Sequence, residues 1–346
     1  MKIGIDISPL QTGHSVRGVG FYVKNLTEYL LKYDVVNQYL FLKNLNDLDK
    51  VDVLHIPYFD PFFIHLPLIK RAKLVVTVHD LTPLIFPNLF PIGIKGSIKW
   101  SINKALLKRA DAIITDSDAS KRDIHKLTGV ALDKIHRVYL AASHDFKTLN
   151  ISRRESERIL KKYKLPEEFL LYVGDVTANK NLPTLIDAVK KTDITLVLVG
   201  KALSNTDYDH ANPWNKDLVQ IHKKISNNSQ FKVLGFVDQE DLTSLYNLAT
   251  ASILPSLYEG FGLPVLEAMQ SGCPVITTKR GSLKEVAGNA AYFVDPESSE
   301  DIAKGITEVM KNKKLQIELK EKGLEHTKKF SWKKTSEQTI QVYKSL

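Results

Sequence analysis

Two glutamates, Glu259 and Glu267, stand eight positions apart in the stretch LPSLYEGFGLPVLEAMQSGCPV at 254–275. A strand pattern leads to Pro255 and a helical pattern follows Pro264, so we expect Glu259 in a loop and Glu267 about one turn into a helix. Carboxylates accept hydrogen bonds from diols, and N–H groups at a helix start bind phosphates. The stretch therefore fits a ligand with hydroxyls at each end and phosphate between them, the layout of a nucleotide sugar. The simpler alternative is that Glu267 complements the helix dipole.

Other residues suited to binding polar groups follow predicted strands. Gly18 and Gly20 would let the backbone approach a ligand, although a plain strand–helix turn explains them as well. His79 ends the strand 73–79, where it can bond a polar ligand or cap a local turn. Lys180 precedes a helix, and a cation beside a helix start suits phosphate oxygens, although most such lysines only solvate the helix end.

Elements of alternating type must position these residues. Strands separated by helix-length segments predict βαβ units and parallel sheets. The expected strands are 2–6, 51–56, 73–79, 111–117 and 134–139, followed after a break by 169–175, 194–200, 231–236, 251–256, 274–278 and 290–295. The sequence therefore predicts an α/β protein of two Rossmann-like, doubly wound domains.

The break between the two sets of strands, at 145–168, is charged and has no strand pattern. A chain of 346 residues also exceeds the length at which one core stops growing. We expect an N-terminal domain at 1–165, a C-terminal domain at 166–329 and a closing helix at 330–346 that packs back on the first domain. Because ligands lie beyond the carboxyl ends of such strands, these ends are expected to face each other across a central cleft.

The composition excludes several kinds of site. A single cysteine, Cys273, allows no internal disulfide and no cysteine-based zinc site, and the ten histidines lack metal-ligand spacing. No apolar run reaches the roughly 18–20 residues needed to cross a bilayer, and the N-terminus has no signal-peptide pattern, so a cytoplasmic protein is expected.

Positive charge is concentrated in the first half, where positions 1–165 hold 26 Lys and Arg against 16 Asp and Glu. Such an excess fits nucleic acid, an anionic membrane or a phosphorylated substrate, and no nucleic-acid-binding motif supports the first. The segment 90–110, FPIGIKGSIKWSINKALLKRA, mixes apolar and basic residues at helical spacing. It is expected either to rest on the inner face of an anionic membrane or to be an ordinary core-facing helix with a solvated basic face.

Several motifs resemble those of the retaining glycosyltransferases of family 4, which have the GT-B architecture. The motifs are GVGFYVKNL, VHDL, DSDASKRDI, YVGDVTANKNLPTLIDAV, GFVDQEDLTSLYNLA, LPSLYEGFGLPVLEAMQSGCPVITTKRGSLKEVAGNAAYFVDP and FSWKKT, and they run through nearly the whole chain. The most specific is the pair of glutamates with GFGLP between them. The chain is most similar to bacterial mannosyltransferases of polysaccharide assembly.

The resemblance implies a role for each candidate residue. Glu267 would bind the nucleotide ribose, Glu259 the donor sugar and Lys180 the diphosphate, with His79 beside the transferred sugar. Lys180, Glu259 and His79 would form the catalytic set. Further donor-binding residues implied in the same way are Gly18, Gly20, Phe236, Val237, Gly260, Phe261, Gly262 and Leu263.

One departure from the family pattern concerns the diphosphate. Many relatives carry an arginine where this sequence has Asp175 or Asn179. Neutralisation of the diphosphate would then depend on Lys180 and on a cation of the first domain such as Arg17.

The resemblance implies transfer of a sugar, with mannose from GDP-mannose as the first expectation, to a hydroxyl of a glycan or lipid-linked saccharide with retention of configuration. No metal is expected, because a lysine and a helix start can stabilise the leaving diphosphate. UDP-, ADP- or dTDP-linked donors are alternatives, as is a non-catalytic module that binds nucleotide sugars. A GT-B epimerase fits the glutamate pair less well, and a dinucleotide-dependent dehydrogenase would need a GxGxxG fingerprint that is absent.

Overall fold

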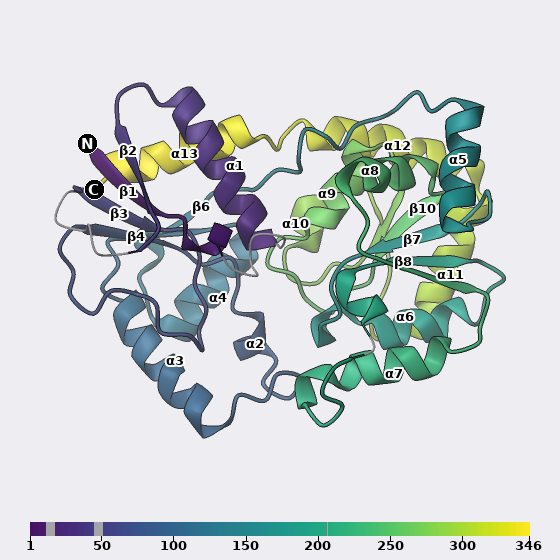
Figure 1. Cartoon of the computed structure of the whole chain (residues 1–346), viewed down its shortest axis with the longest axis horizontal. Helices are drawn as coiled ribbons and strands as arrows, with labels where there is room; N and C mark the ends of the chain where they lie inside the picture. Colours follow the sequence, from purple (N-terminus) through teal and green to yellow (C-terminus); the bar gives the residue numbers. More distant parts are fainter. Residues whose placement is uncertain (12–17, 45–50, 206) are drawn as a thin grey trace. The chain divides into compact units, whose positions relative to one another are not determined.

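The structure is a computed structural model that describes residues 1–11, 18–44, 51–205 and 207–346 (Figure 1). They form two compact units, the first comprising Met1–Pro87, Ile92–Ala141 and Phe330–Leu346, and the second Asn88–Pro91 and Ala142–Lys329. Within the described residues each unit holds one six-stranded sheet whose strand pairs are all parallel. The predicted α/β class with two doubly wound sheets is confirmed.

The sheet of the first unit has the order β2-β1-β3-β4-β5-β6. Its strands are β1 (Lys2–Asp6), β2 (Gln38–Leu42), β3 (Val53–Ile56), β4 (Lys73–Thr77), β5 (Ala112–Thr115) and β6 (Ile135–Arg137). The helices of this unit are α1 (Gly18–Tyr33), α2 (Thr82–Ile85), α3 (Gly93–Leu107), α4 (Asp118–Thr128) and α13 (Trp332–Lys344). Strands β3 and β5 are buried along their whole length, as expected for central strands of a parallel sheet covered on both faces.

Strand β2 is not among the strands that the sequence predicts. It lies at the edge of the sheet and pairs in parallel with β1. Most of its residues, QYLFL, are exposed or only partly buried. An edge strand of this kind needs no continuous run of β-branched residues, which is why the pattern does not reveal it.

The sheet of the second unit has the order β12-β11-β10-β7-β8-β9. Its strands are β7 (Leu170–Val173), β8 (Leu196–Val199), β9 (Phe231–Gly235), β10 (Ala251–Leu254), β11 (Val275–Thr277) and β12 (Tyr292–Phe293). Its helices are α5 (Arg153–Tyr163), α6 (Leu182–Val189), α7 (Lys216–Ile225), α8 (Gln239–Leu248), α9 (Leu263–Gln270), α10 (Leu283–Ala287), α11 (Ser299–Lys311) and α12 (Lys313–Thr327). Helix α5 packs against α8, so the segment from Ala142 onward groups with this unit, whereas the sequence assigns it to the first domain up to 165.

Several helices begin where the sequence supplies a capping side chain. Ser117 Oγ accepts the N–H of Ser120 at 3.0 Å at the start of α4, and Asp238 does the same for Asp241 at the start of α8. Ser331 caps α13. Each cap satisfies one of the N–H groups that a helix start leaves without an intrahelical acceptor, so local sequence determines these boundaries.

Helix α13 packs against α1 and completes the core of the first unit. The ring of Trp332 meets that of Phe21 edge-on, with 5.8 Å between centroids. At the other end of α13, the buried Tyr343 Oη lies 2.6 Å from Nδ1 of His55 in β3. His55 Nε2 in turn lies 2.8 Å from Thr77 Oγ1, and burial lowers the pKa of His55 to about 3. His55 is therefore a neutral imidazole with a partner on each nitrogen.

The variant Tyr343→Phe is expected to destabilise the protein by about 1–3 kcal/mol, because it leaves a buried His55 nitrogen without a hydrogen-bond partner. Urea unfolding monitored by circular dichroism measures this. The exposed Gln341 of the same helix provides the control, since Gln341→Ala removes no buried contact. Equal midpoints for Tyr343→Phe and the wild type would contradict the assigned bond.

Candidate functional site

The stretch with the two glutamates connects β10 to α9 in the second unit. Gly262 has a φ of 99°, in the left-handed region, and a Cβ there would lie 2.8 Å from Leu283 Cδ2. Glycine therefore makes this turn without strain. Pro264 is the second residue of α9, a position where its missing N–H costs no hydrogen bond.

Glu259 lies in the loop before α9, and Glu267 is the fifth residue of that helix. The first turn of α9 contains no acidic residue. Because the effect of the helix dipole falls off within the first turn, the alternative role of Glu267 as a partner of the dipole has little support.

Lys180 and Glu259 form a nearly buried ion pair. Lys180 Nζ lies 2.7 and 2.8 Å from the two carboxylate oxygens, and the side chains are 17% and 9% exposed. Ser256 Oγ donates a further hydrogen bond to Glu259 at 2.5 Å. An ammonium group has three donors, so one remains to reach an anion after the two bonds to Glu259. The pair thus presents a positioned cation and a positioned carboxylate together.

Two buried asparagines hold the lysine segment against the Glu259 loop. Asn179 Nδ2 donates to the Tyr258 carbonyl at 3.0 Å, and Asn181 Nδ2 donates to the Pro255 carbonyl at 3.2 Å. Asn181 adopts a φ of 61°, which asparagine tolerates better than most residues. Asn179, where this sequence departs from the family pattern, therefore joins two loops. The sequence does not reveal this role.

The loop after β11 supports the turn from another side. The Ser282 N–H donates to the Glu259 carbonyl at 3.1 Å, and Ser282 Oγ lies 2.8 Å from the Phe261 carbonyl. Gly281 has a φ of 56°, and a Cβ there would lie 2.5 Å from the Glu259 carbonyl oxygen. This close approach of two backbones requires glycine, and it fixes the backbone on which Glu259 stands.

Glu267 is only partly exposed and accepts a hydrogen bond from Tyr246 Oη at 3.1 Å. Burial raises the pKa of Glu267 to about 7, although the bond from Tyr246 acts in the opposite direction. A carboxyl group that changes charge near neutral pH, with one oxygen fixed by Tyr246, is suited to contact hydroxyls of a bound molecule.

The remaining predicted residues of the second unit lie after β9 and β10. Phe236 directly follows β9 and is 70% exposed, whereas Val237 is buried. Gly260 and Phe261 are buried in the turn, and Leu263 starts α9. Because the strands are parallel, these residues share one edge of the sheet, with β7 and β8 between β10 and β9.

His79 follows β4 in the first unit and pairs with Asp116, which follows β5. His79 Nδ1 lies 2.7 Å from Asp116 Oδ2, and the two side chains are 20% and 3% exposed. Burial disfavours protonation, but Asp116, together with Asp80 and the Pro57 backbone, outweighs it and raises the pKa of His79 above its usual range. The sequence does not predict Asp116 as a partner, although residues that follow neighbouring parallel strands meet at one sheet edge.

Gly18 and Gly20 belong to α1. Gly18 is exposed, and a Cβ there would meet nothing within 4 Å, so packing alone does not require a glycine. Gly20 is buried. Arg17, the predicted additional cation, lies outside the described residues.

The part of the chain that the structure describes contains neither a cluster of metal ligands nor a helix that could span a membrane. There, no three His, Cys, Asp or Glu side chains gather in a way that could hold a metal ion. Over the same residues, every helix is too short or too polar to span a bilayer.

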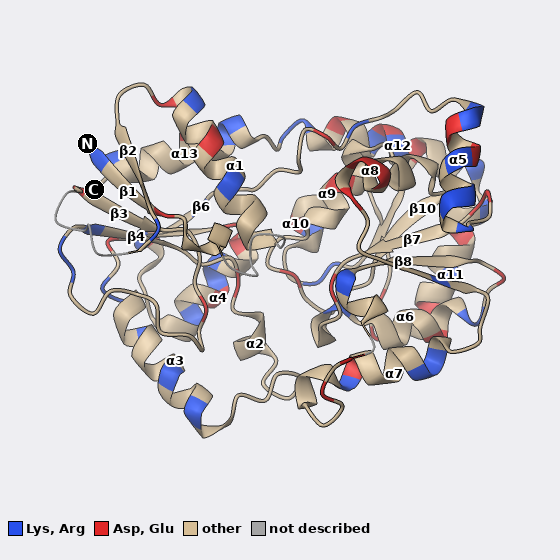
Figure 2. Cartoon of the chain, viewed as in Figure 1, with Lys and Arg blue, Asp and Glu red and all other residues tan. Residues whose placement is uncertain are grey.

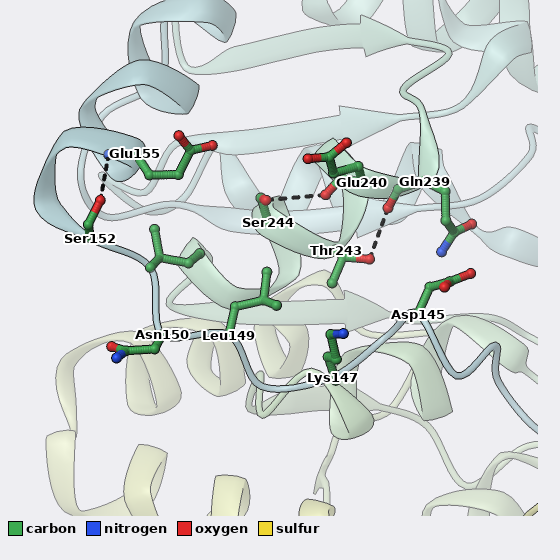
Figure 3. Close-up of a pocket in the computed structure, with 11 residues that line it drawn as sticks. Asp145, Lys147, Leu149, Asn150, Ser152, Glu155, Gln239, Glu240, Thr243 and Ser244 are labelled. Atoms are coloured by element: carbon green, nitrogen blue, oxygen red, sulfur yellow. Dashed lines mark hydrogen bonds between the residues drawn. The ribbon is translucent and has the colours of Figure 1, made fainter.

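A separate cavity of about 720 Å³ lies in the second unit beside α5 and α8 (Figure 3). Asp145, Glu155 and Glu240 line it together with Lys147, and none of the predicted site residues does so. Three carboxylates against one lysine disfavour a diphosphate. The cavity is therefore a poor candidate for the anion-binding site.

The arrangement around α9 can bind an anion and hydroxyls together. At the start of α9, Pro264 has no N–H and the Val265 N–H donates to the Gly262 carbonyl, which leaves the N–H groups of Gly262 and Leu263 for an anion, and Lys180 adds a positive charge. Glu259 and Glu267 add carboxylates on either side of the turn.

Both halves of the chain match the model of a known protein family. Positions 153–326 match the model for glycosyl transferases group 1, and positions 13–146 match that for glycosyltransferase family 4. The chain is 31% identical over 285 residues to O-antigen chain mannosyltransferase B of Escherichia coli, a match that covers 80% of this chain and 71% of that protein. It is 29% identical over 282 residues to a serotype-specific mannosyltransferase of Escherichia coli, covering 79% of this chain and 34% of that longer protein.

Two solved structures share the fold. Sucrose-phosphate synthase from Thermosynechococcus elongatus has a TM-score of 0.78, covering 100% of this chain and 98% of that one at 18% identity. Anabaena HepE in complex with UDP-glucose has a TM-score of 0.75, covering 100% of both chains at 18% identity. These likenesses confirm the expected GT-B fold.

Proposed function

The chain belongs to the family 4 glycosyltransferases of group 1, and from this membership we propose that it transfers mannose from GDP-mannose to a hydroxyl of a glycan or lipid-linked saccharide with retention of configuration. The products would serve bacterial polysaccharide assembly. The transfer of mannose extends to the chain what the names of its mannosyltransferase relatives say of those proteins, whereas the GDP-linked donor and the retention of configuration follow from the resemblance of its motifs.

The observation that carries the proposal is the Lys180–Glu259 pair beside the start of α9. A nucleotide sugar places a negatively charged diphosphate next to sugar hydroxyls. The ammonium and the N–H groups of Gly262 and Leu263 at the start of α9 would bind the diphosphate, while the Glu259 carboxylate would accept hydrogen bonds from the sugar. Glu267 would bind the ribose hydroxyls, with Phe236 and Val237 near the base.

In the proposed reaction, the bond between the sugar C1 and the diphosphate oxygen breaks, and the acceptor hydroxyl oxygen bonds to C1 on the same face. The acceptor proton passes to the leaving phosphate oxygen. Negative charge grows on the diphosphate as the bond breaks, so Lys180 and the N–H groups of Gly262 and Leu263 would stabilise the transition state more than the bound donor. The role of His79 beside the sugar stays a prediction.

A donor panel tests the proposal directly. Purified protein is incubated with GDP-mannose, UDP-glucose, ADP-glucose or dTDP-glucose, and its melting temperature is measured. We expect the largest rise with GDP-mannose, since a ligand that binds only the folded state stabilises it by mass action. Release of GDP in the presence of a mannose-containing acceptor then measures turnover.

The panel also separates the alternatives. A larger shift with a UDP-, ADP- or dTDP-sugar would replace GDP-mannose as the donor. A shift without release of nucleotide over a range of saccharide acceptors would favour a non-catalytic binding module. Absence of any shift would overturn the proposed donor site.

Ionisation of Glu267 is expected to make nucleotide binding depend on pH. The ionised carboxylate accepts hydrogen bonds from both ribose hydroxyls, and its pKa in the free protein is about 7. The affinity for GDP should therefore fall by up to about tenfold per pH unit as the pH drops below 7. Calorimetry on the wild type and on Glu267→Gln, which does not titrate, isolates this effect from titration of GDP. Parallel pH profiles of the two proteins would contradict it.

The same pKa has a consequence for the protein without nucleotide. Between about pH 4.5 and 7 the carboxyl is ionised in the unfolded chain but largely protonated in the folded one. The folded state then binds more protons, so the contribution of Glu267 to stability falls as the pH rises through this window. In Glu267→Gln the free energy of unfolding, measured with urea at several pH values in this window, should lack that pH-dependent decrease.

A further inference from the structure

Helix α3 carries one apolar row, formed by Ile94, Ile98, Ile102 and Leu106, that is exposed toward the start of the helix and buried at its end. Leu106 and Leu107 are buried in the core of the first unit. In contrast, Ile94, Ile98 and Ile102 are 82%, 57% and 39% exposed. Residues four positions apart follow one another along the same side of a helix, so the three isoleucines form a single exposed stripe. A core-facing helix with a merely basic outer face does not account for this stripe.

A second exposed apolar segment is bound to α3. Phe63, Ile64, Leu68 and Ile69, in the loop between β3 and β4, are each at least two-fifths exposed. The buried Asn103 of α3 donates Nδ2 to the Phe63 carbonyl at 3.1 Å, and Arg109 donates to the Leu68 carbonyl at 2.7 Å. These bonds hold the loop beside the helix, so the two segments form one surface. We call it the α3 surface: the exposed residues of 62–69 and of 94–102.

The α3 surface is positively charged. Lys95 and Lys99 stand exposed among the isoleucines of the stripe, and Lys108 and Arg109 follow at the end of the helix. Positions 90–110 contain five basic residues and no acidic one. Figure 2 accordingly shows basic positions on α3 and no acidic ones. Lys70, at the end of the loop, pairs with Asp111 at 2.6 Å and is left out of the cationic set.

We propose that the α3 surface docks the protein on an anionic lipid bilayer. Ile94, Ile98 and Ile102 enter the boundary between headgroups and acyl chains, and Lys95 and Lys99 contact lipid phosphates. The absence of acidic side chains on α3 removes the repulsion that an anionic surface would otherwise meet. Six of the large exposed apolar side chains of the α3 surface are aliphatic and one, Phe63, is aromatic, which suits a lipid boundary better than the several stacked rings that bind single-stranded nucleic acid. This inference does not depend on the proposed donor.

Vesicle sedimentation tests the proposal on the full chain. The probes are vesicles of phosphatidylcholine alone and of phosphatidylcholine mixed with phosphatidylglycerol. We expect binding to the mixed vesicles only, and its reversal by added salt. Lys95→Glu/Lys99→Glu should lower the bound fraction at least about tenfold, and Ile94→Ser/Ile98→Ser should lower it even at low salt.

Helix α12 of the second unit offers a matched control, because it also carries an exposed isoleucine, Ile317, and an exposed lysine, Lys314. Lys314→Glu/Ile317→Ser should bind vesicles as the wild type does. The substituted side chains are exposed, so we expect the α3 variants to keep the melting temperature of the wild type. An unchanged melting temperature shows that the variants are folded. Three results would overturn the proposal: no binding of the wild type, equal loss in the α12 control, or a dimer that dissociates in the α3 variants without any vesicle binding.

Discussion

Replacement of Lys180 by alanine is expected to lower kcat by about 10²–10³-fold, the usual loss when a group that stabilises developing charge is removed. Its ammonium is held within 2.7–2.8 Å of both Glu259 oxygens and retains one donor for the leaving diphosphate. Because that charge grows as the bond breaks, kcat should fall more than KM rises. The measurement is release of nucleotide from the donor that the panel identifies.

A structural effect of the same substitution has to be separated from the catalytic one. Lys180→Ala leaves the buried Glu259 carboxylate without its cation, which costs about 3–5 kcal/mol for a buried pair. The double variant Lys180→Ala/Glu259→Gln removes this unpaired charge, and it should recover stability without recovering kcat. The exposed Lys190 at the end of α6 is the matched control, and Lys190→Ala should keep full turnover. Wild-type turnover in Lys180→Ala would disprove its role.

Replacing Glu259 and Glu267 by alanine is expected to impair different properties of the protein. Glu267→Ala should weaken binding of free GDP by about 10–100-fold, because a pair of hydrogen bonds to ribose hydroxyls is lost. Glu259→Ala should leave the affinity for free GDP nearly unchanged but reduce kcat and the preference for one donor sugar over another. Calorimetry with GDP and competition between donors measure the two effects.

A matched acid outside the site controls for a general change in charge. Glu240 is exposed on α8, so Glu240→Ala should alter neither affinity nor turnover. Equal losses of GDP affinity in Glu259→Ala and Glu267→Ala would contradict the separate roles. A loss of GDP affinity in Glu259→Ala alone would reverse them.

All strands of the two sheets except β2 could be predicted from the sequence, because local chemistry determines them. Runs of β-branched residues mark the buried strands, and Gly262 with Pro264 marks the start of α9. Edge strand β2 was not predicted, because most of its side chains are exposed or only partly buried and need not be apolar. The sequence therefore predicts the strands and helix starts that burial and capping determine within a few residues.

The contacts of the site depend on pairs that lie far apart in the chain. Lys180 and Glu259 are 79 positions apart, and His79 and Asp116 are 37 apart. Residue type and strand position predict that such groups reach the same sheet edge, but a single sequence does not reveal which partner each one takes. For positions 90–110 the sequence leaves two alternatives, a helix on a membrane or a core-facing helix, because isoleucines and leucines at helical spacing look alike until burial shows which of them are covered.

The position of α13 also sets an order in which the protein can be completed during synthesis. Tyr343 and its partner His55 are 288 positions apart, so β3 leaves the ribosome long before the residue that satisfies its buried histidine. At about 5–20 residues per second, the delay is roughly 15–60 s. The second unit ends at Lys329, before α13 begins, so it can complete its core first. The unit that contains β3 thus receives its last helix after the second unit is complete, and until then His55 lacks one of its two partners.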